Sequence, residues 1–333
     1  QHAWRVSGFP AHRVLGMASS RVFGLNAEKM ETSYGLPYEP VNLGAGSVYK
    51  IFTAATAMAK GMGINHVLTV PPSGYTSPIY VDGGGRPIPV RNSGDYAGRM
   101  SLTQALATSP NTAFIKLEEF TGVPDVVDMA VKLGMRSLAT TKFVDPRTGR
   151  PTDRSIAEVT KAQKQASFTL GVSQTSVLEL ANVGATLASE GTWCPPSPIE
   201  SITDRNGNPV PLTEAPCEQV VETGLANALL NALGEDHTIG TAASAARQAG
   251  WNRPMAGKTG TTQQHKSAAF LGVVPQMSGA VITFDNTNRP RPLCDGAGAP
   301  FPCGSGNIFG GKTPAQTWFG AVKPLLEGDR KST

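Results

Sequence analysis

A serine and a lysine three positions apart form the first candidate for chemistry in the sequence. Ser47 and Lys50 begin a stretch with helical apolar spacing, so their side chains share one face. A serine hydroxyl is a weak nucleophile that needs an adjacent base, and a lysine can act as that base once burial lowers its pKa. Ser-x-x-Lys also recurs by chance, and a serine at a helix start is more often only a cap. The pair predicts nucleophilic catalysis only if other segments support it.

Two further polar motifs lie downstream. Ser109-Pro110-Asn111 falls between two expected helices, where a loop can direct both polar side chains into a cleft, although these residues also commonly end a helix in a turn. Lys258-Thr259-Gly260-Thr261 lies at the end of an expected strand, where Gly260 permits close approach of a ligand or another backbone. The alternative is an ordinary strand with solvated lysine and threonine side chains.

Helices and strands are expected on either side of these motifs. Ser101 and Ser176 each start a Ser-x-x-Gln/Glu capping box, and Asn206-Gly207 predicts a hairpin turn. Residues 71–87 contain Pro and Gly clusters typical of a loop. Apolar spacing predicts helices over 47–60, 101–107, 112–120, 124–133, 176–191, 218–233 and 313–326. Strands over 254–260, 268–274 and 279–284 are expected to pair as consecutive antiparallel neighbours.

Composition excludes several classes of protein. The 333 residues are 40% hydrophobic and 16% charged, which indicates a globular chain with a substantial core. The net charge of +4 comes from scattered residues, so a nucleic-acid partner is not expected. No apolar run approaches the ~18 residues of a membrane helix. The chain begins at Gln1 without Met or a signal sequence, and we expect it to be a piece of a longer protein.

The four cysteines fall into two local pairs in loops rich in Pro and Gly. An even count in loops favours disulfides and an oxidising compartment, although four cysteines allow three connectivities. Because each local pair closes a short loop, we predict Cys194–Cys217 and Cys294–Cys303. Zinc binding is the alternative, but no His lies beside a cysteine and the spacing is too wide.

The three polar motifs, taken together and in this order, resemble the transpeptidase domain of class A penicillin-binding proteins. The likeness runs from about Val14 to Leu326, and the second cysteine pair with the following Gly310-Gly311-Lys312-Thr313-Pro314 is most similar to actinobacterial, including mycobacterial, members. One departure is Ser267-Ala268-Ala269-Phe270, where many members have Asp followed by Ala-Trp-Phe. This departure leaves the detail of the acceptor or substrate groove open.

The resemblance implies an α/β (α+β) fold of the penicillin-binding and serine β-lactamase type. An antiparallel sheet flanked by helices is expected, with a mainly helical subdomain over roughly 52–190. The transpeptidase domain would span 15–327, preceded by a linker remnant at 1–14 and followed by a tail at 328–333. By the same resemblance, the parent protein carries a membrane-anchored glycosyltransferase upstream, which places this domain on the extracytoplasmic face of the bacterial membrane.

The resemblance also implies a role for each motif residue. Ser47 would attack the penultimate D-Ala carbonyl of a peptidoglycan stem peptide, with Lys50 as base. Ser109 would relay the proton to the leaving D-Ala, and Asn111 would bind the substrate's peptide bond. The terminal carboxylate would be bound by the segment Lys258, Thr259, Gly260 and Thr261. The oxyanion would be bound by the backbone N–H groups of Ser47 and Thr261. A β-lactam would trap Ser47, and no metal or organic cofactor is implied.

Other functions compete with serine D,D-transpeptidation. A D,D-carboxypeptidase or a β-lactam or cell-wall sensor without turnover would use the same residues. A β-lactamase lacks support because no Glu-x-x-Leu-Asn stretch supplies a deacylating base, and no Gly-x-Ser-x-Gly nucleophile elbow occurs. Residues 306–313 fit the phosphate-loop pattern Gly-x4-Gly-Lys-Thr, but they follow Gly and Pro residues and not a buried strand.

Overall fold

A three-stranded antiparallel sheet forms the centre of the computed structural model, which describes residues 12–40, 43–285, 290–294 and 303–328. Its strands are β15 (Ala256–Thr261), β16 (Ser267–Val274) and β17 (Met277–Phe284), in the order β15-β16-β17. The expectation of three consecutive antiparallel strands is confirmed. Every residue of β16 is buried, so this strand has neighbours on both faces.

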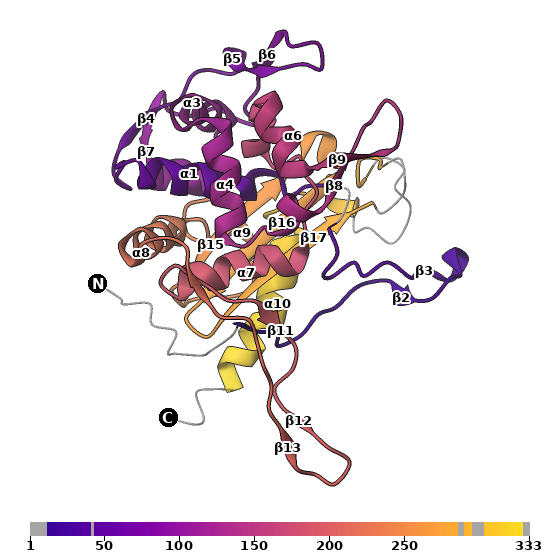
Figure 1. The fold of residues 1–333 in the computed structure, drawn as a ribbon. Coiled ribbons are helices and arrows are strands. Elements are labelled where there is room, and N and C mark those ends of the chain that lie inside the picture. The colour runs from indigo at the N-terminus through magenta and orange to yellow at the C-terminus, as the bar shows by residue number, and fades with distance from the viewer. Residues whose placement is uncertain (1–11, 41–42, 286–289, 295–302, 329–333) are drawn as a thin grey trace.

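The two faces of the sheet pack against different helices (Figure 1). Ala269, Leu271 and Val273 face the larger core beneath α7 (Val177–Ala188). Phe270 and Val274 alternate with them and join the cluster of α10 (Thr313–Gly328), which includes Trp318. The period-two alternation of a strand therefore divides β16 between two cores.

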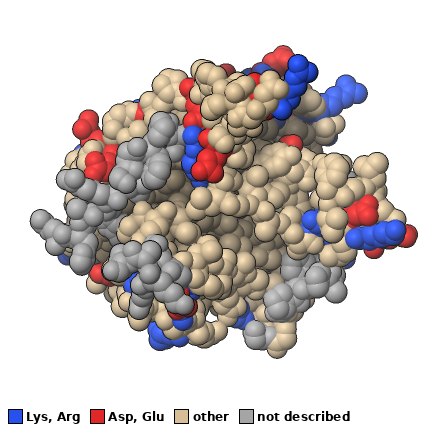
Figure 2. All heavy atoms as spheres, turned by 90° about the horizontal axis from the view of Figure 1, so that it is seen from below, with Lys and Arg blue, Asp and Glu red and all other residues tan. Residues whose placement is uncertain are grey.

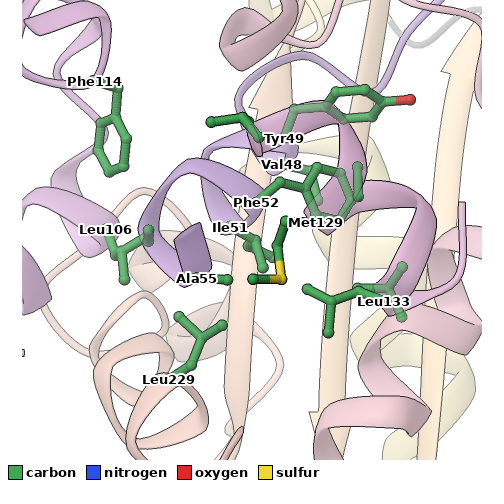
Figure 3. Close-up of a cluster of buried hydrophobic side chains, with 14 of the residues drawn as sticks. Val48, Tyr49, Ile51, Phe52, Ala55, Leu106, Phe114, Met129, Leu133 and Leu229 are labelled. Carbon is green, nitrogen blue, oxygen red and sulfur yellow. The ribbon is translucent and has the colours of Figure 1, made fainter. Parts of the chain in front are cut away.

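A central helix, α1 (Lys50–Ala59), organises the helical part of the molecule. Eight of its ten residues are buried, because helices cover it on several sides. Large apolar side chains such as Ile51 and Phe52 fill this core (Figure 3), and each contributes about 1.5–3 kcal/mol when fully buried. The surrounding helices are α2 (Leu102–Thr108), α3 (Asn111–Thr121), α4 (Val123–Leu133) and α8 (Thr223–Ala232).

Small β-sheets interrupt the region expected to be mainly helical. The loop expected over 71–87 is wrong, because most of it lies in the hairpin of β5 (Tyr75–Val81) and β6 (Pro87–Val90). Its prolines are tolerated because each strand of a two-stranded sheet has a free edge. Two other pairs lie in the same region: β4 (Val67–Thr69) with β7 (Arg99–Ser101), and β8 (Lys142–Val144) with β9 (Pro151–Ser155).

Helix starts follow the expected capping signals with two exceptions. The capping box at Ser101 is confirmed. Ser176 caps α7, but the Glu179 carboxylate accepts hydrogen bonds from Ser137 and does not complete a capping box. The helix expected over 218–233 begins only at Thr223, because β14 (Glu218–Gln219) pairs with β10 (Thr192–Trp193).

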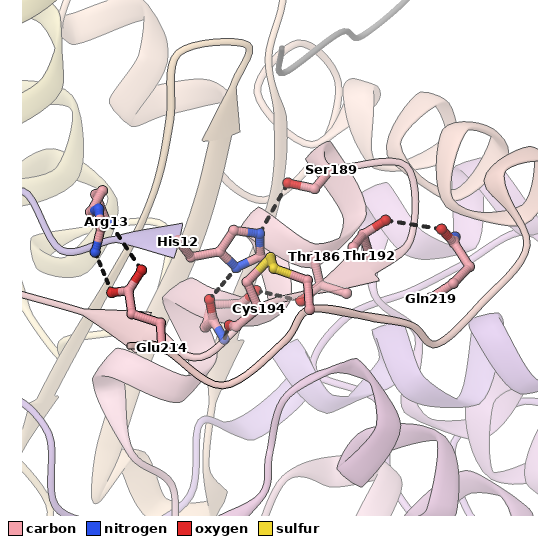
Figure 4. Close-up of a disulfide and its surroundings, with 10 residues drawn as sticks. His12, Arg13, Thr186, Ser189, Thr192, Cys194, Glu214 and Gln219 are labelled. Carbon is pink, nitrogen blue, oxygen red and sulfur yellow. Dashed lines mark hydrogen bonds and ion pairs between the residues drawn. A yellow bond between two sulfur atoms is a disulfide. The ribbon is translucent and has the colours of Figure 1, made fainter. Parts of the chain in front are cut away.

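Both expected disulfides, Cys194–Cys217 and Cys294–Cys303, are present. Near the first one, β1 (His12–Arg13) pairs with β11 (Pro196–Ser197), and the His12 ring lies between Asn182 and Ser189 (Figure 4). The hairpin expected around Asn206-Gly207 is confirmed in β12 (Ile202–Thr203) and β13 (Pro209–Val210).

The remaining elements are short strands, short helices and 3-10 turns. They are β2 (Val22–Phe23), β3 (Glu31–Thr32), α5 (Ser137–Thr140), α6 (Ile156–Gln163), α9 (Ala243–Gln248) and the 3-10 turns η1 (Ala27–Lys29), η2 (Gly46–Tyr49), η3 (Ala166–Leu170), η4 (Leu233–Glu235), η5 (Gln263–His265) and η6 (Cys303–Ser305).

The expected terminal segments, 1–14 and 328–333, fall almost entirely outside the described residues. Within the described ranges, no helix has the length and apolar character needed to cross a membrane. On the face drawn in Figure 2, Lys and Arg side chains alternate with Asp and Glu and form no continuous patch of one sign.

Candidate active site

Ser47 lies on the 3-10 turn η2, directly before α1. It is partly exposed, whereas Gly46 and Val48 on either side are buried. Gly46 adopts φ +59°, and a Cβ there would overlap the backbone of Thr261, so only glycine allows this close approach. Among the described residues, the Ser47 hydroxyl has no hydrogen-bond partner. The hydroxyl is therefore available to a ligand.

The Lys50 ammonium group connects the first two motifs. Its Nζ lies 2.7 Å from Ser109 O, 3.0 Å from Ser109 Oγ and 2.8 Å from Asn111 Oδ1. Ser109 ends α2 in the left-handed region at φ 68°, which is rare for a residue other than glycine. Asn111 starts α3, and its Nδ2 also donates to Arg91 O. The helix-ending turn and the polar cluster, posed as alternatives by the sequence, are both present in the structure.

Lys50 has the properties of a base. It is fully buried, and burial together with the nearby charge of Lys258 holds the pKa of Lys50 well below its ordinary value. A neutral amine has two hydrogens and one lone pair. With three oxygen atoms around Nζ, the neutral form can donate to Ser109 O and Asn111 Oδ1 and accept from the Ser109 hydroxyl. This arrangement connects Lys50 with Ser109 for proton transfer.

The end of β15 supplies a backbone donor beside η2. Thr262 N donates to Ser267 O on the β16 side, and N–H groups of neighbouring strand residues point in opposite directions, so Thr261 N points away from β16. On η2, Gly46 N and Val48 N donate to Gly171 O and Ala45 O, while Ser47 N has no backbone acceptor within the described chain. Two such N–H groups can bind a developing negative charge.

Lys258 and Thr259 lie deeper than the sequence suggests. Lys258 has no exposed surface, and its Nζ donates to Thr259 O at 3.1 Å. Burial lowers the pKa of Lys258 to about 8, although the Asp236 carboxylate opposes this effect. Thr259 is 5% exposed, and its hydroxyl contacts that of Thr241. Lys258 thus acts on the site through its charge, and direct contact with a ligand requires its side chain to move.

Further residues support the site although the motifs did not indicate them. Ser267 donates from Oγ to Gly44 O at 2.7 Å and so ties the start of β16 to the turn before Ser47. It is also the first residue of the segment that departs from the family pattern, which was the only sequence signal. Gly310 N donates to Thr261 Oγ1 at 3.1 Å, so the apparent phosphate-loop residues hold a threonine of the third motif.

Comparison with known proteins agrees with this geometry. Residues 13–291 match the sequence model of the penicillin binding protein transpeptidase domain. The chain belongs to this family of penicillin-binding transpeptidase domains. The expected class A resemblance and fold class are thereby confirmed.

The similar proteins include mycobacterial ones. The chain is 25% identical over 315 residues to penicillin-binding protein 1A of Mycobacterium tuberculosis, covering 91% of this chain and 34% of that protein. It is 26% identical over 318 residues to the Mycolicibacterium smegmatis protein of the same name, covering 88% and 35%. The solved structure of the Mycobacterium tuberculosis penicillin-binding protein PonA1 has a TM-score of 0.66 at 23% identity, covering 92% of this chain and 73% of that one. The chain thus spans about a third of the length of these two curated relatives.

Proposed function

We propose that this domain is a serine D,D-transpeptidase that cross-links peptidoglycan stem peptides and is inhibited by β-lactams. The observation that carries the proposal is the contact of Lys50 Nζ with both Ser109 Oγ and Asn111 Oδ1, one helical turn after Ser47. A buried amine, a second hydroxyl and an amide are thus in contact with one another, one helical turn after a serine whose hydroxyl has no hydrogen-bond partner within the described chain. Acyl transfer needs these groups together.

Acylation proceeds by attack of Ser47 Oγ on the penultimate D-Ala carbonyl. Neutral Lys50 takes the Ser47 proton, and the N–H groups of Ser47 and Thr261 stabilise the oxyanion. Ser109 passes its proton to the departing D-Ala nitrogen as the peptide bond breaks and takes one in turn from Lys50, which leaves an ester on Ser47 and a neutral Lys50. The second Nδ2 hydrogen of Asn111, not used by Arg91 O, binds the substrate's peptide carbonyl.

Transfer completes the reaction. The amine of a second stem peptide attacks the ester, its proton passes through Lys50 or Ser109 to Ser47 Oγ as the ester bond breaks, and Ser47 is regenerated. Lys258 and Thr261, at the end of β15, bind the terminal carboxylate of the donor. A β-lactam presents a similar acyl group and carboxylate. Among the solved relatives, PonA1 of Mycobacterium tuberculosis has been determined in complex with penicillin V, and penicillin-binding protein A from M. tuberculosis as an imipenem acyl-enzyme.

We further propose that the domain works on the extracytoplasmic face of a bacterial membrane. The two disulfides support an oxidising compartment. The two curated relatives are about three times as long as the matched region, which agrees in length with the upstream glycosyltransferase and membrane anchor that the resemblance implies.

The test is acylation by a labelled penicillin, read as an intact mass. We expect one adduct on Ser47, loss of the adduct in Ser47→Ala, and no effect of Ser201→Ala, a control at an exposed serine. An adduct that persists in Ser47→Ala would exclude this nucleophile. A stem-peptide donor with an added acceptor amine then separates transpeptidase from carboxypeptidase, because only the former gives the cross-linked product. Acylation without any turnover of the donor would indicate a sensor.

A further inference from the structure

A buried carboxylate that no motif indicated lies behind β15. Asp236 follows η4 and has no exposed surface. Its Oδ1 accepts hydrogen bonds from Thr241 N at 2.9 Å, Thr241 Oγ1 at 2.8 Å and Ala242 N at 3.3 Å. Within the described chain, its Oδ2 has no hydrogen-bond partner. A buried carboxylate costs free energy unless it is paired, so its retention at this position calls for a role.

The hydrogen bonds of Asp236 fix the direction of a hydroxyl chain that ends in the third motif. Oδ1 is a carboxylate oxygen that accepts from two backbone N–H groups, so it cannot donate to the Thr241 hydroxyl. The single hydrogen of that hydroxyl must therefore point to Oδ1. The Thr241 hydroxyl is in turn in contact with the Thr259 hydroxyl. The Thr259 hydrogen must therefore point to Thr241, and Thr259 Oγ1 offers only lone pairs in other directions.

Asp236 also supplies the counter-charge for Lys258. Both side chains are fully buried. Burial raises the pKa of Asp236, whereas the charge of Lys258 and the hydrogen bonds from Thr241 and Ala242 lower it; the Asp236 carboxylate in turn raises the pKa of Lys258 against the larger effect of burial. On the elements with the main contacts to β15, the other titratable groups are Tyr49 on η2 and Glu235 on η4. Lys50, Glu222 and Lys266 lie directly beside such elements. Burial raises the pKa of Tyr49, so it stays neutral, and Lys50 lies close enough to Lys258 for the charge of Lys258 to lower its pKa.

We propose that Asp236 is a positioning residue for the carboxylate-binding end of the site, acting through Thr241 on the Thr259 hydroxyl and through its charge on Lys258. The proposal rests on the proposed function and specifies which groups of β15 bind the substrate carboxylate. Thr259 does not donate to the substrate carboxylate. Thr261 can do so, because its Oγ1 already accepts from Gly310 N and its own hydrogen is free. Lys258 and Thr261 then provide the positive charge and the donor for the carboxylate.

The first test compares the pH dependence of penicillin acylation in the 333-residue chain and in Asp236→Asn. In the wild type, the second-order rate is expected to fall above about pH 8, as Lys258 loses its proton. Asn keeps an acceptor oxygen but removes the charge, so this alkaline limb moves to lower pH by about one unit or more. Glu118→Gln is the matched control, since Glu118 is also a fully buried acid but belongs to α3. The alkaline limb of the Glu118→Gln variant is expected at the same pH as in the wild type.

The second test examines the hydroxyl chain and also covers failure of Asp236→Asn to fold. Thr241→Val removes the link between Asp236 and Thr259, and we expect acylation to slow about fivefold, the effect of roughly 1 kcal/mol. Thr241→Ser restores the hydroxyl and the rate. An unmoved alkaline limb in folded Asp236→Asn, or equal rates for the Val and Ser variants, would overturn the proposal. If the wild-type chain itself is not acylated at Ser47, the proposed function fails instead.

Discussion

Two buried lysines share the candidate site, and their neighbours act on their pKa values in opposite directions. Lys50 is surrounded by neutral oxygen atoms, and the charge of Lys258 adds to the effect of burial in lowering the pKa of Lys50. Lys258 has the Asp236 carboxylate near it, which opposes the lowering. A base must be neutral and a carboxylate-binding group must be charged. The position of the Asp236 carboxylate therefore agrees with the different roles proposed for the two lysines.

The role of Lys50 predicts a large effect of Lys50→Arg. Arginine keeps the positive charge but stays protonated in proteins, so it cannot accept the Ser47 proton. We expect the rate of penicillin acylation to fall about 10²–10⁴-fold. Lys60→Arg, the same change at the C-terminal end of the same helix, is the control and should leave the rate unchanged. A Lys50→Arg protein that acylates at the wild-type rate would rule out Lys50 as the base.

At the scale of elements, the segment that carries the second disulfide supports the site from outside the sheet. Leu293 N donates to His265 O, the Ile308 carbonyl contacts the His265 ring, and Gly310 N donates to Thr261 Oγ1. Leu293 and Ile308 form a small core with Ala268 of β16. The first disulfide, by contrast, lies beside α7 and the N-terminal strand (Figure 4).

The two disulfides are therefore expected to differ in their effect on activity. Replacing Cys194 and Cys217 by Ser should lower the free energy of unfolding by about 2–4 kcal/mol without changing acylation of the folded protein. Replacing Cys294 and Cys303 should also slow acylation, by about fivefold if the Gly310–Thr261 hydrogen bond is lost. Denaturation and acylation kinetics on both double variants measure this. Equal acylation rates in the two would show that the second loop does not support Thr261.

Local signals in the sequence predicted elements well, and tertiary pairing limited the rest. Ser101 with Gln104 gave a correct helix start because both hydrogen bonds lie within one turn. Glu179 failed as a capping partner because Ser137, distant in sequence, takes its carboxylate. The same limit applies to the site. Ser47, Lys50 and the β15 residues carry family motifs, whereas Asp236 could not be found because its contact with Thr241 and Thr259 depends on how η4 packs against β15.

At the scale of the whole molecule, the site lies where the helical region meets the edge of the sheet. The turn η2, which carries Ser47, contacts both β15 and η3, so segments more than a hundred residues apart meet there. The close approach depends on glycine on each side, because a Cβ on Gly260 would overlap Ala45 O just as one on Gly46 would overlap Thr261. The rigid α1 core and the sheet thus fix the two halves of the site relative to each other.

This architecture predicts a long-lived acyl-enzyme with penicillin. Lys50 can activate Ser47, but hydrolysis also needs a base beside a water molecule at the acyl carbon. Asp236, a buried acid in the site's hydrogen-bond network, is linked to β15 only through the Thr241 and Thr259 hydroxyls. An acceptor peptide avoids this need, because its amine is itself the nucleophile. Mixing the protein with a chromogenic β-lactam should give a stoichiometric burst followed by a nearly flat line, with no burst in Ser47→Ala. Sustained hydrolysis at ~1 s⁻¹ or faster, as in a working hydrolase, would contradict this expectation.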